Sequence, residues 1–250
     1  MGGRVGSITT EIIEDGLVFN MDAANRASYV PYATASYNTT KPLGTNSISS
    51  SLAGQLYNDT SFIPPPTSAS CWSFDGTDDY IDPGAIWTPY LGGNRGCECS
   101  ISFWLKTNDT GTGGIFDFYP WSTMFAKAAS NRPILQVNGV NYRNWTDGGQ
   151  WDGNWHNMCL ILPTTAATDA AGVGFDYATS ELYVDGVLQT VYNTGGTSFT
   201  SLEWNRFHFP SSQNYGKLAC EIAHVYAYNR VLSANEVLHN YNALKGRFGL

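Results

Sequence analysis

The stretch from Ser100 to Lys106, SISFWLK, alternates between apolar side chains and a more mixed set. Successive side chains of a β-strand point to opposite faces, so Ile101, Phe103 and Leu105 would share one face and Trp104 would lie on the other. This period of two predicts a strand whose apolar face is buried. We therefore assign Ile101, Phe103 and Leu105 to a core.

The composition favours one all-β domain. The 250 residues include 26 Gly, 15 Tyr, 12 Phe and 8 Trp, and only 14% are charged. Such a composition is typical of many short aromatic strands joined by glycine turns. All-β sandwiches of this length often form a single unit, so a second domain is not needed to account for the chain.

One helix is predicted, near the end of the chain. Ser233 and Glu236 have the spacing of a capping box, in which the hydroxyl and the carboxylate each accept a backbone N–H. Gly246 is expected to end this helix, which we expect to lie across the sandwich. Four apolar residues follow the cap with helical spacing: Val237, Leu238, Tyr241 and Leu244.

The segment 73–82, SFDGTDDYID, carries a tight-turn signal between two β-prone runs. Glycine takes positive φ without steric cost and aspartate tolerates it, so Asp75-Gly76 predicts the turn. The bend gathers Asp75, Asp78 and Asp79. Three carboxylates on one short loop are candidate ligands of Ca²⁺, which prefers oxygen. The alternative is that they cap the turn and face water, as turn aspartates commonly do.

Charge and cysteine content restrict the partners and the compartment. The net charge of −8 argues against nucleic acid or an anionic membrane as a partner. We find no apolar run of the ~18 residues that a membrane span needs, and MGGRVGSITT does not resemble a signal peptide. The five cysteines, an odd number, are expected to be reduced. The protein is therefore expected either to stay in the cytoplasm where it is made or to leave by a route that does not use such a leader.

Residues 1–15 are predicted to form an arm before a domain that spans 16–250. The glycines at its start favour flexibility, and Ile8, Ile12 and Ile13 are its apolar residues. One interpretation is an assembly arm that ties a subunit to its neighbour. The other is a simple first strand of the same chain.

Glycine-rich segments around several tryptophans form a second candidate site. Exposed aromatic rings beside hydroxyl-binding carboxylates can stack on sugar faces, although tryptophan is also commonly buried. The candidate glycan-binding residues are Trp121, Trp145, Asp147, Trp151 and Asp152.

Several segments occur in an order that resembles a known superfamily. They are FDGTDDY (74–80), SISFWLKT (100–107), DGNWHNM (152–158), ELYVDGV (181–187) and residues 217–248. Together they are similar to the concanavalin A-like lectin/glucanase superfamily, in its laminin G-like branch. GLVFNMDAANRASY (16–29) resembles the start of that domain in virion proteins of marine tailed bacteriophages. The resemblance covers most of residues 16–248 and implies a two-sheet antiparallel jelly-roll sandwich with one short C-terminal helix.

The resemblance also implies a role. The expected function is that of a non-enzymatic virion structural protein, either a capsid (head) decoration or a head or tail fibre component on the virion surface. Its partners would be further copies of itself, in a homo-oligomer, and other virion proteins such as the major capsid or tail proteins. The alternative is a carbohydrate-binding, lectin-like module for host or environmental glycans.

An enzyme is not expected. The E-x-D-x-E pattern of the related glucanases, which places acids two residues apart on one strand, is absent from the sequence. A G-x-S-x-G elbow for a serine nucleophile is absent too. Calcium at the Asp75 turn is the one candidate cofactor.

Overall fold

The alternating strand predicted from Ser100 to Lys106 lies inside the larger sheet of the computed structural model, as β7 (Cys99–Lys106). It pairs with β12 (Trp155–Leu162) on one side and with β17 (Cys220–Tyr228) on the other. The structure describes residues 12–25, 39–40, 54–57, 60–64, 69–82, 98–120, 123–137, 141–163, 176–196, 204–210 and 216–250.

The larger sheet has eight strands, and β17 is long enough to pair with three of them. The C-terminal part of β17 pairs with β1 (Leu17–Asp22), and its N-terminal part pairs with β5 (Cys71–Phe74) on the same side. β7 runs along the other side of β17. The strand order, with β1 beside β17, is β14 (Val187–Leu188), β13 (Glu181–Val184), β12, β7, β17, β5 and β4 (Ser61–Ile63).

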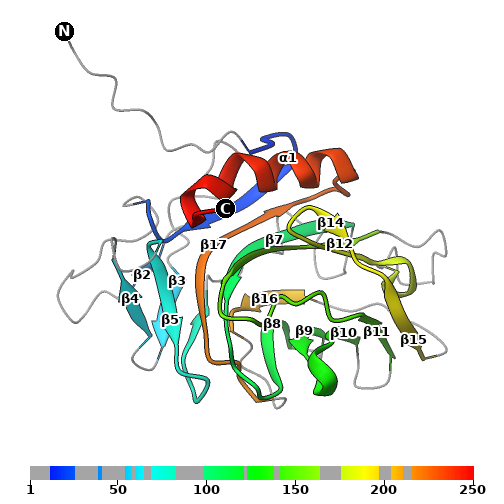
Figure 1. Ribbon diagram of the computed structural model, residues 1–250, viewed down its shortest axis with the longest axis horizontal. Helices are drawn as coiled ribbons and strands as arrows, with labels where there is room; N and C mark the ends of the chain where they lie inside the picture. The colour runs from blue at the N-terminus through cyan, green and yellow to red at the C-terminus, as the bar shows by residue number, and fades with distance from the viewer. Residues whose placement is uncertain are drawn as a thin grey trace, which may run out of the picture.

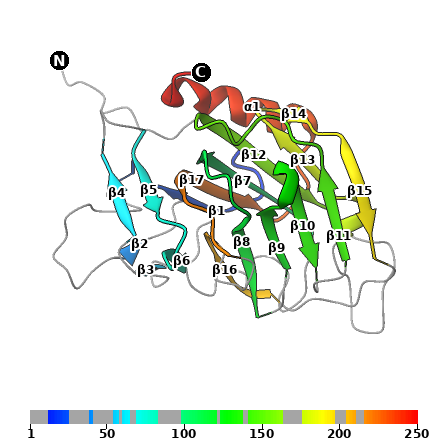
Figure 2. The same cartoon turned by 60° about the horizontal axis from the view of Figure 1, so that its bottom comes forward.

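A six-stranded sheet lies opposite, and a three-stranded sheet flanks one end of the sandwich (Figures 1 and 2). Neighbouring strands run antiparallel throughout. The six are, in order, β15 (Val191–Gly195), β11 (Asn141–Trp145), β10 (Pro133–Val137), β9 (Thr123–Lys127), β8 (Gly113–Pro120) and β16 (Trp204–His208). The three are β2 (Thr39–Thr40), β3 (Gly54–Tyr57) and β6 (Tyr80–Asp82).

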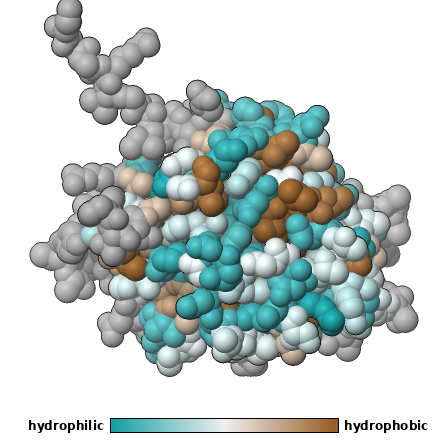
Figure 3. Space-filling model, in the orientation of Figure 1, coloured by the Kyte–Doolittle hydropathy of each residue, from teal (hydrophilic) through white to brown (hydrophobic). Residues whose placement is uncertain are grey.

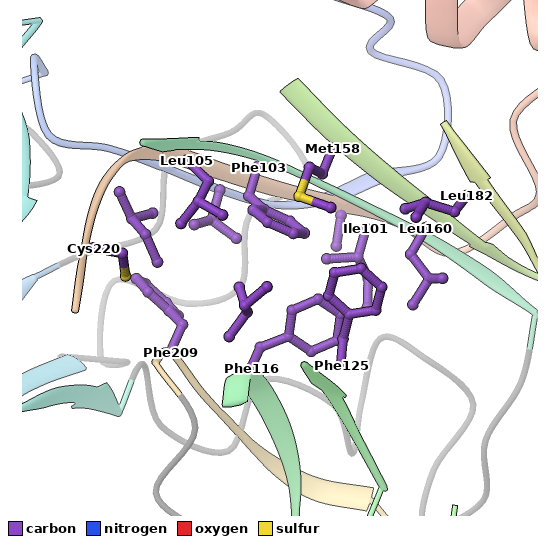
Figure 4. Packing of buried hydrophobic residues seen from close by; sticks show 14 of the residues in the cluster. Ile101, Phe103, Leu105, Phe116, Phe125, Met158, Leu160, Leu182, Phe209 and Cys220 are labelled. Carbon is purple, nitrogen blue, oxygen red and sulfur yellow. The ribbon is translucent and has the colours of Figure 1, made fainter. Parts of the chain in front are cut away.

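The core fills the space between the two large sheets. Ile101, Phe103 and Leu105 point into it from β7, as the alternation predicts, and all three are buried. Phe116 and Phe125 reach them from the six-stranded sheet (Figure 4). Phe103 meets Phe116 edge to face with ring centroids 5.6 Å apart, the arrangement that aromatic quadrupoles favour. The all-β sandwich is thereby confirmed.

The predicted helix is α1 (Ala234–Leu244), and it lies across the outer face of the eight-stranded sheet (Figure 1). Its capping box forms between Ser233 and Glu236. Two details of the prediction are wrong. Leu238 is 43% exposed, whereas Asn240, which was not predicted, is one of the buried residues of the helix. The chain also continues past Gly246 in a 3-10 helix, η3 (Lys245–Phe248), and Gly249 takes the left-handed conformation at φ +80°.

The segment 12–15 is tied to its own domain. Ile12 is buried in the apolar layer under α1, and Ile13 is partly buried against the same layer. The Ile13 N–H donates to the Asn240 side chain at 2.8 Å, and the Tyr228 hydroxyl donates to the Ile13 carbonyl at 2.9 Å. The prediction that these two isoleucines reach a neighbouring subunit is therefore wrong, because their own chain covers them. Ile8 lies outside the described residues.

Four of the five cysteines lie in described segments, and all four are buried thiols: Cys71, Cys99, Cys159 and Cys220. Burial raises the pKa of the Cys159 thiol to about 12, although a hydrogen bond with Ser102 opposes the shift. Among the helices that the structure describes, none combines the length and apolarity that a membrane crossing requires.

Candidate functional site

Three strands of the larger sheet bring their connections together at one end of the sandwich. β5 and β7 end where β17 begins, because both run antiparallel to β17 on either side of it. Phe74 and Lys106 therefore lie close to Cys220, although they are far apart in sequence. The loops that follow β5 and β7 surround the start of β17.

A cleft of about 300 Å³ opens at this end of the sheet. Its lining is mostly polar and combines two hydroxyls, an amide, an ammonium and a carboxylate. The lining residues are Ser73, Phe74, Lys106, Thr107, Asn108, Gly153, Ala219, Cys220 and Glu221.

Lys106 and Glu221 form an ion pair in the cleft. The Lys106 ammonium lies 3.2 Å from a Glu221 carboxylate oxygen, and the two side chains are 32% and 22% exposed. The same carboxylate lies 3.6 Å from the Cys71 sulfur. Partial exposure leaves the pair open to solvent, so a ligand that enters the cleft meets a donor and an acceptor that already hold each other in place.

The rim of the cleft is fixed by hydrogen bonds of the loop after β7. The Thr107 hydroxyl donates to the Ala219 carbonyl at 2.7 Å, and the Ala219 N–H donates to the Asp109 carboxylate at 3.0 Å. The Gly153 N–H donates to the Thr107 carbonyl at 3.0 Å. These bonds join three segments that are distant in sequence, so the shape of the cleft does not depend on a bound ligand.

The predicted acidic turn stands beside the cleft. Gly76 takes φ +79°, and a Cβ there would lie 2.8 Å from the Ala219 backbone nitrogen, so this position requires glycine. Oxygens of Asp75, Asp78 and Asp79 lie within 4.8 Å of one another, which confirms that the bend gathers the three carboxylates. The Asp79 carboxylate is buried and accepts from the Asp75 N–H at 3.0 Å, while Asp75 and Asp78 are exposed.

The acidic turn offers part of a calcium shell. Burial raises the pKa of Asp79, the Asp75 N–H lowers it, the charges of Asp75 and Asp78 raise it further, and the charge of Lys217 lowers it. A cation would relieve that mutual repulsion. Ca²⁺ takes six to eight oxygens, however, and the Asp75 carboxylate already accepts the Thr77 N–H at 2.6 Å. An ion bound here would therefore keep several waters, and calcium remains a proposal.

The predicted tryptophan site is not assembled. Trp145 is fully buried at the end of β11, with its ring centroid 6.3 Å from that of Phe125 in the core. Trp151 is 9% exposed, and its indole N–H donates to the Asn131 carbonyl at 2.7 Å. Neither ring can stack on a sugar in this arrangement, so for these two residues the prediction is wrong. Trp121 lies outside the described residues.

The two aspartates predicted with those tryptophans are exposed, and both accept hydrogen bonds from backbone N–H groups of their own loop. Asp147 accepts from the Gly149 N–H at 2.9 Å. Asp152 accepts from the Asn154 N–H at 2.8 Å and lies 3.1 Å from the Nε2 of His156. Such bonds are typical of aspartates that stabilise turns.

A buried charge cluster that the sequence did not indicate joins the small sheet to the six-stranded sheet. His208 lies with its Nδ1 3.0 Å from Asp117 and its Nε2 3.7 Å from Asp82. Burial lowers the pKa of His208, but hydrogen bonds and charge from the two carboxylates outweigh it and raise the pKa to about 9. The carboxylates flank opposite sides of the ring, so the cluster fixes β6 against β8 and β16.

Comparisons with solved structures place this architecture among known folds. The receptor-binding domain of botulinum neurotoxin C/D mosaic serotype aligns with a TM-score of 0.59 and 13% identity over 92% of this chain and 52% of that one. Trypanosoma rangeli sialidase in complex with sialic acid aligns with a TM-score of 0.56 and 12% identity over 93% of this chain and 33% of that one. These similarities agree with an antiparallel β-sandwich.

The likeness extends to the fold alone, because identity is low and one fold hosts many functions. The chain spans about half of the toxin domain and a third of the sialidase. No protein-family model matches the sequence, and the comparison with curated proteins finds no match.

Proposed function

We propose that this lectin-like β-sandwich is a non-enzymatic binding module that takes a glycan in the cleft beside the Asp75 turn. The observation that carries the proposal is the polar lining of that cleft, which presents Lys106, Asn108 and Glu221 together. Hydroxyl-rich ligands need donors and acceptors at fixed positions, and pockets obtain specificity from a few such groups. The rim bonds of Thr107 supply that rigidity.

The lining of the cleft also favours binding over hydrolysis. Glycoside hydrolysis uses a pair of carboxyl groups on either side of the scissile bond. Among the described residues that line the cleft, Glu221 alone carries a carboxylate, and it is paired with Lys106 at 3.2 Å. The chain therefore lacks there the second acid that the usual reaction needs.

A glycan array followed by titration calorimetry tests the proposal. We expect binding by the wild-type protein, and a loss of about fivefold or more in affinity for Asn108→Ala or Glu221→Gln, because each removes a polar contact worth about 1–3 kcal/mol. Asn108 is exposed, so its truncation leaves the fold intact.

Asp147→Ala is the matched control, since Asp147 is exposed on the loop where the tryptophans are buried. It should bind as the wild type does. If Asp147→Ala abolished binding while Asn108→Ala did not, the ligand site would lie on that loop. If the array gave no signal, the glycan proposal would be rejected.

We propose further that the module is displayed on a virion. This rests on the sequence resemblance of GLVFNMDAANRASY to the start of such domains in phage virion proteins. Mass photometry of the purified protein with undecorated phage heads, and separately with tails, tests it. A mass increase on either particle is expected, and a protein indifferent to both would remove the virion role while leaving glycan binding intact.

A further inference from the structure

The nine residues 187–195, VLQTVYNTG, contain no charged residue and no proline. They form β14, a two-residue link and β15, so one continuous stretch supplies the terminal strand of both large sheets. Natural proteins usually protect such edges with charge, proline or a covering segment. The stretch 187–195 itself carries neither charge nor proline.

Most of the exposed large apolar side chains lie on the same side of the sandwich. In the part of the chain that the structure describes, six large apolar side chains are exposed, and four of them belong to this stretch. A fifth, Leu238, lies next to it, since its Cδ1 would be 2.9 Å from a Cβ built on Gly186. Figure 3 shows the patch over β14 and the adjacent part of α1. The four are Val187 (62% exposed), Leu188 (51%), Val191 (36%) and Tyr192 (52%).

The strand edges on the opposite side of the sandwich are paired or followed by proline. There β6 connects to the end of β16, where Ile81 and Phe209 exchange backbone hydrogen bonds of 2.8 and 3.2 Å. β4, the other terminal strand, is followed directly by Pro64, which cannot donate to a ladder. In the part of the chain that the structure describes, large apolar side chains are exposed along the β14–β15 edge and not along β4.

We propose that the β14–β15 edge binds a second copy of this chain, in an antiparallel pairing across a two-fold axis. A two-fold contact places the same surface on both partners, so any charge on it would face its own image. Each copy carries a net charge of −8, and an uncharged edge is where two such molecules can approach without like-charge repulsion. Exposed apolar patches with unpaired strand edges fit this kind of contact.

Two cations lie against this stretch and help to order it. The Arg132 guanidinium lies 3.4 Å from the ring centroid of Tyr192. It holds the ring in place, and the Arg143 guanidinium lies 3.4 Å from the Thr194 hydroxyl. The Asn193 side chain is held by Asn144 at 3.1 Å, so the edge is ordered before a partner arrives.

Sedimentation velocity from low to high micromolar concentration tests the pairing, and hydrogen exchange locates it. We expect a monomer–dimer equilibrium and slower exchange of amides in 187–195 at high concentration. The double variant Val187→Lys/Val191→Lys should raise the dissociation constant by more than about tenfold, because like charges would then face each other across the axis.

Leu250→Lys is the control, since Leu250 is equally exposed at 50% but lies at the chain end. It should leave the equilibrium unchanged. A wild-type protein that stays monomeric throughout overturns the proposal, and so does a dimer that the double variant does not weaken. Circular dichroism confirms that the variants are folded. None of these outcomes depends on glycan binding, so the two proposals can fail separately.

Discussion

The ring of Phe248 lies parallel to the indole of Trp104, with centroids 3.9 Å apart and planes 11° apart. Trp104 points away from the core between the sheets and is nevertheless fully buried. The second apolar layer of the protein therefore depends on the last helical turn of the chain, which covers the middle of the eight-stranded sheet.

Replacing that ring should cost stability. Phe248→Ala removes the stack on Trp104 and a second contact with Trp155, whose ring centroid is 5.1 Å away. We expect a loss of about 3 kcal/mol in the free energy of unfolding, as for buried aromatics elsewhere. Urea denaturation measures it. Leu250→Ala, two residues further on and exposed, should change it by less than about 0.5 kcal/mol.

Gly76→Ala should loosen the turn beside the cleft. The added Cβ would meet the Ala219 backbone at 2.8 Å, and the residue would keep φ +79°. Both effects oppose alanine, so we expect a loss of about 2 kcal/mol. Gly246→Ala is the matched control, since its Cβ meets nothing within 4 Å. Equal melting temperatures for the two variants would contradict this account.

His208 should limit stability at alkaline pH. Its pKa is raised to about 9 in the folded protein, against about 6.5 in an unfolded chain. Below pH 6.5 both states carry the proton and the contribution is complete. As pH rises towards 9 the unfolded state loses the proton first, so stability falls. His208→Gln should flatten the free energy of unfolding across that window, whereas the exposed His239→Gln should not.

His224 should act in the opposite direction. Burial lowers its pKa to about 4, with the charge of Asp22 opposing the shift and that of Arg247 adding to it. The unfolded chain takes up a proton below about pH 6.5 while the folded protein does not, so stability falls as pH drops from 6.5 towards 4. Chemical denaturation at several pH values should show a smaller acid slope for His224→Gln. An unchanged slope would mean that other groups control acid unfolding.

Calcium should raise the melting temperature if the Asp75 turn binds it. Binding to the folded state alone stabilises by mass action. The repulsion by Asp75 and Asp78, which adds to burial in raising the pKa of Asp79, would be relieved. Differential scanning fluorimetry with millimolar CaCl₂ or with EDTA measures the shift. It should vanish in Asp78→Ala and persist in Asp147→Ala. A wild-type protein with no shift would leave the turn as a solvated cap.

Most of the fold could be predicted because its signals are local. Alternation in 100–106 gave the central strand, and the Ser233–Glu236 spacing gave the helix start. The strand β11 escaped because Tyr142, Arg143 and Asn144 lack an alternating apolar pattern. Missing that strand left Trp145 in a predicted loop, whereas its place at the end of β11 buries the ring in the core.

The candidate site could be predicted only in part. The Asp75 turn lies within one segment, so its residues could be grouped from sequence. The cleft joins Ser73, Asn108 and Glu221, which no short motif connects. Only the order of strands β7, β17 and β5 brings them together, and strand order follows from long-range pairing that a single sequence does not encode locally.

The four buried thiols have a consequence for how the protein tolerates its surroundings. A thiol reacts as the thiolate, and burial raises the pKa values of both Cys159 and Cys220. Cys71, Cys99 and Cys159 are at most 1% exposed, so reagents and oxidants reach these three sulfurs only when the sheets open. The folded protein can pass from a reducing to an oxidising medium with these three side chains unchanged, and the rate at which they become labelled measures the rate of opening.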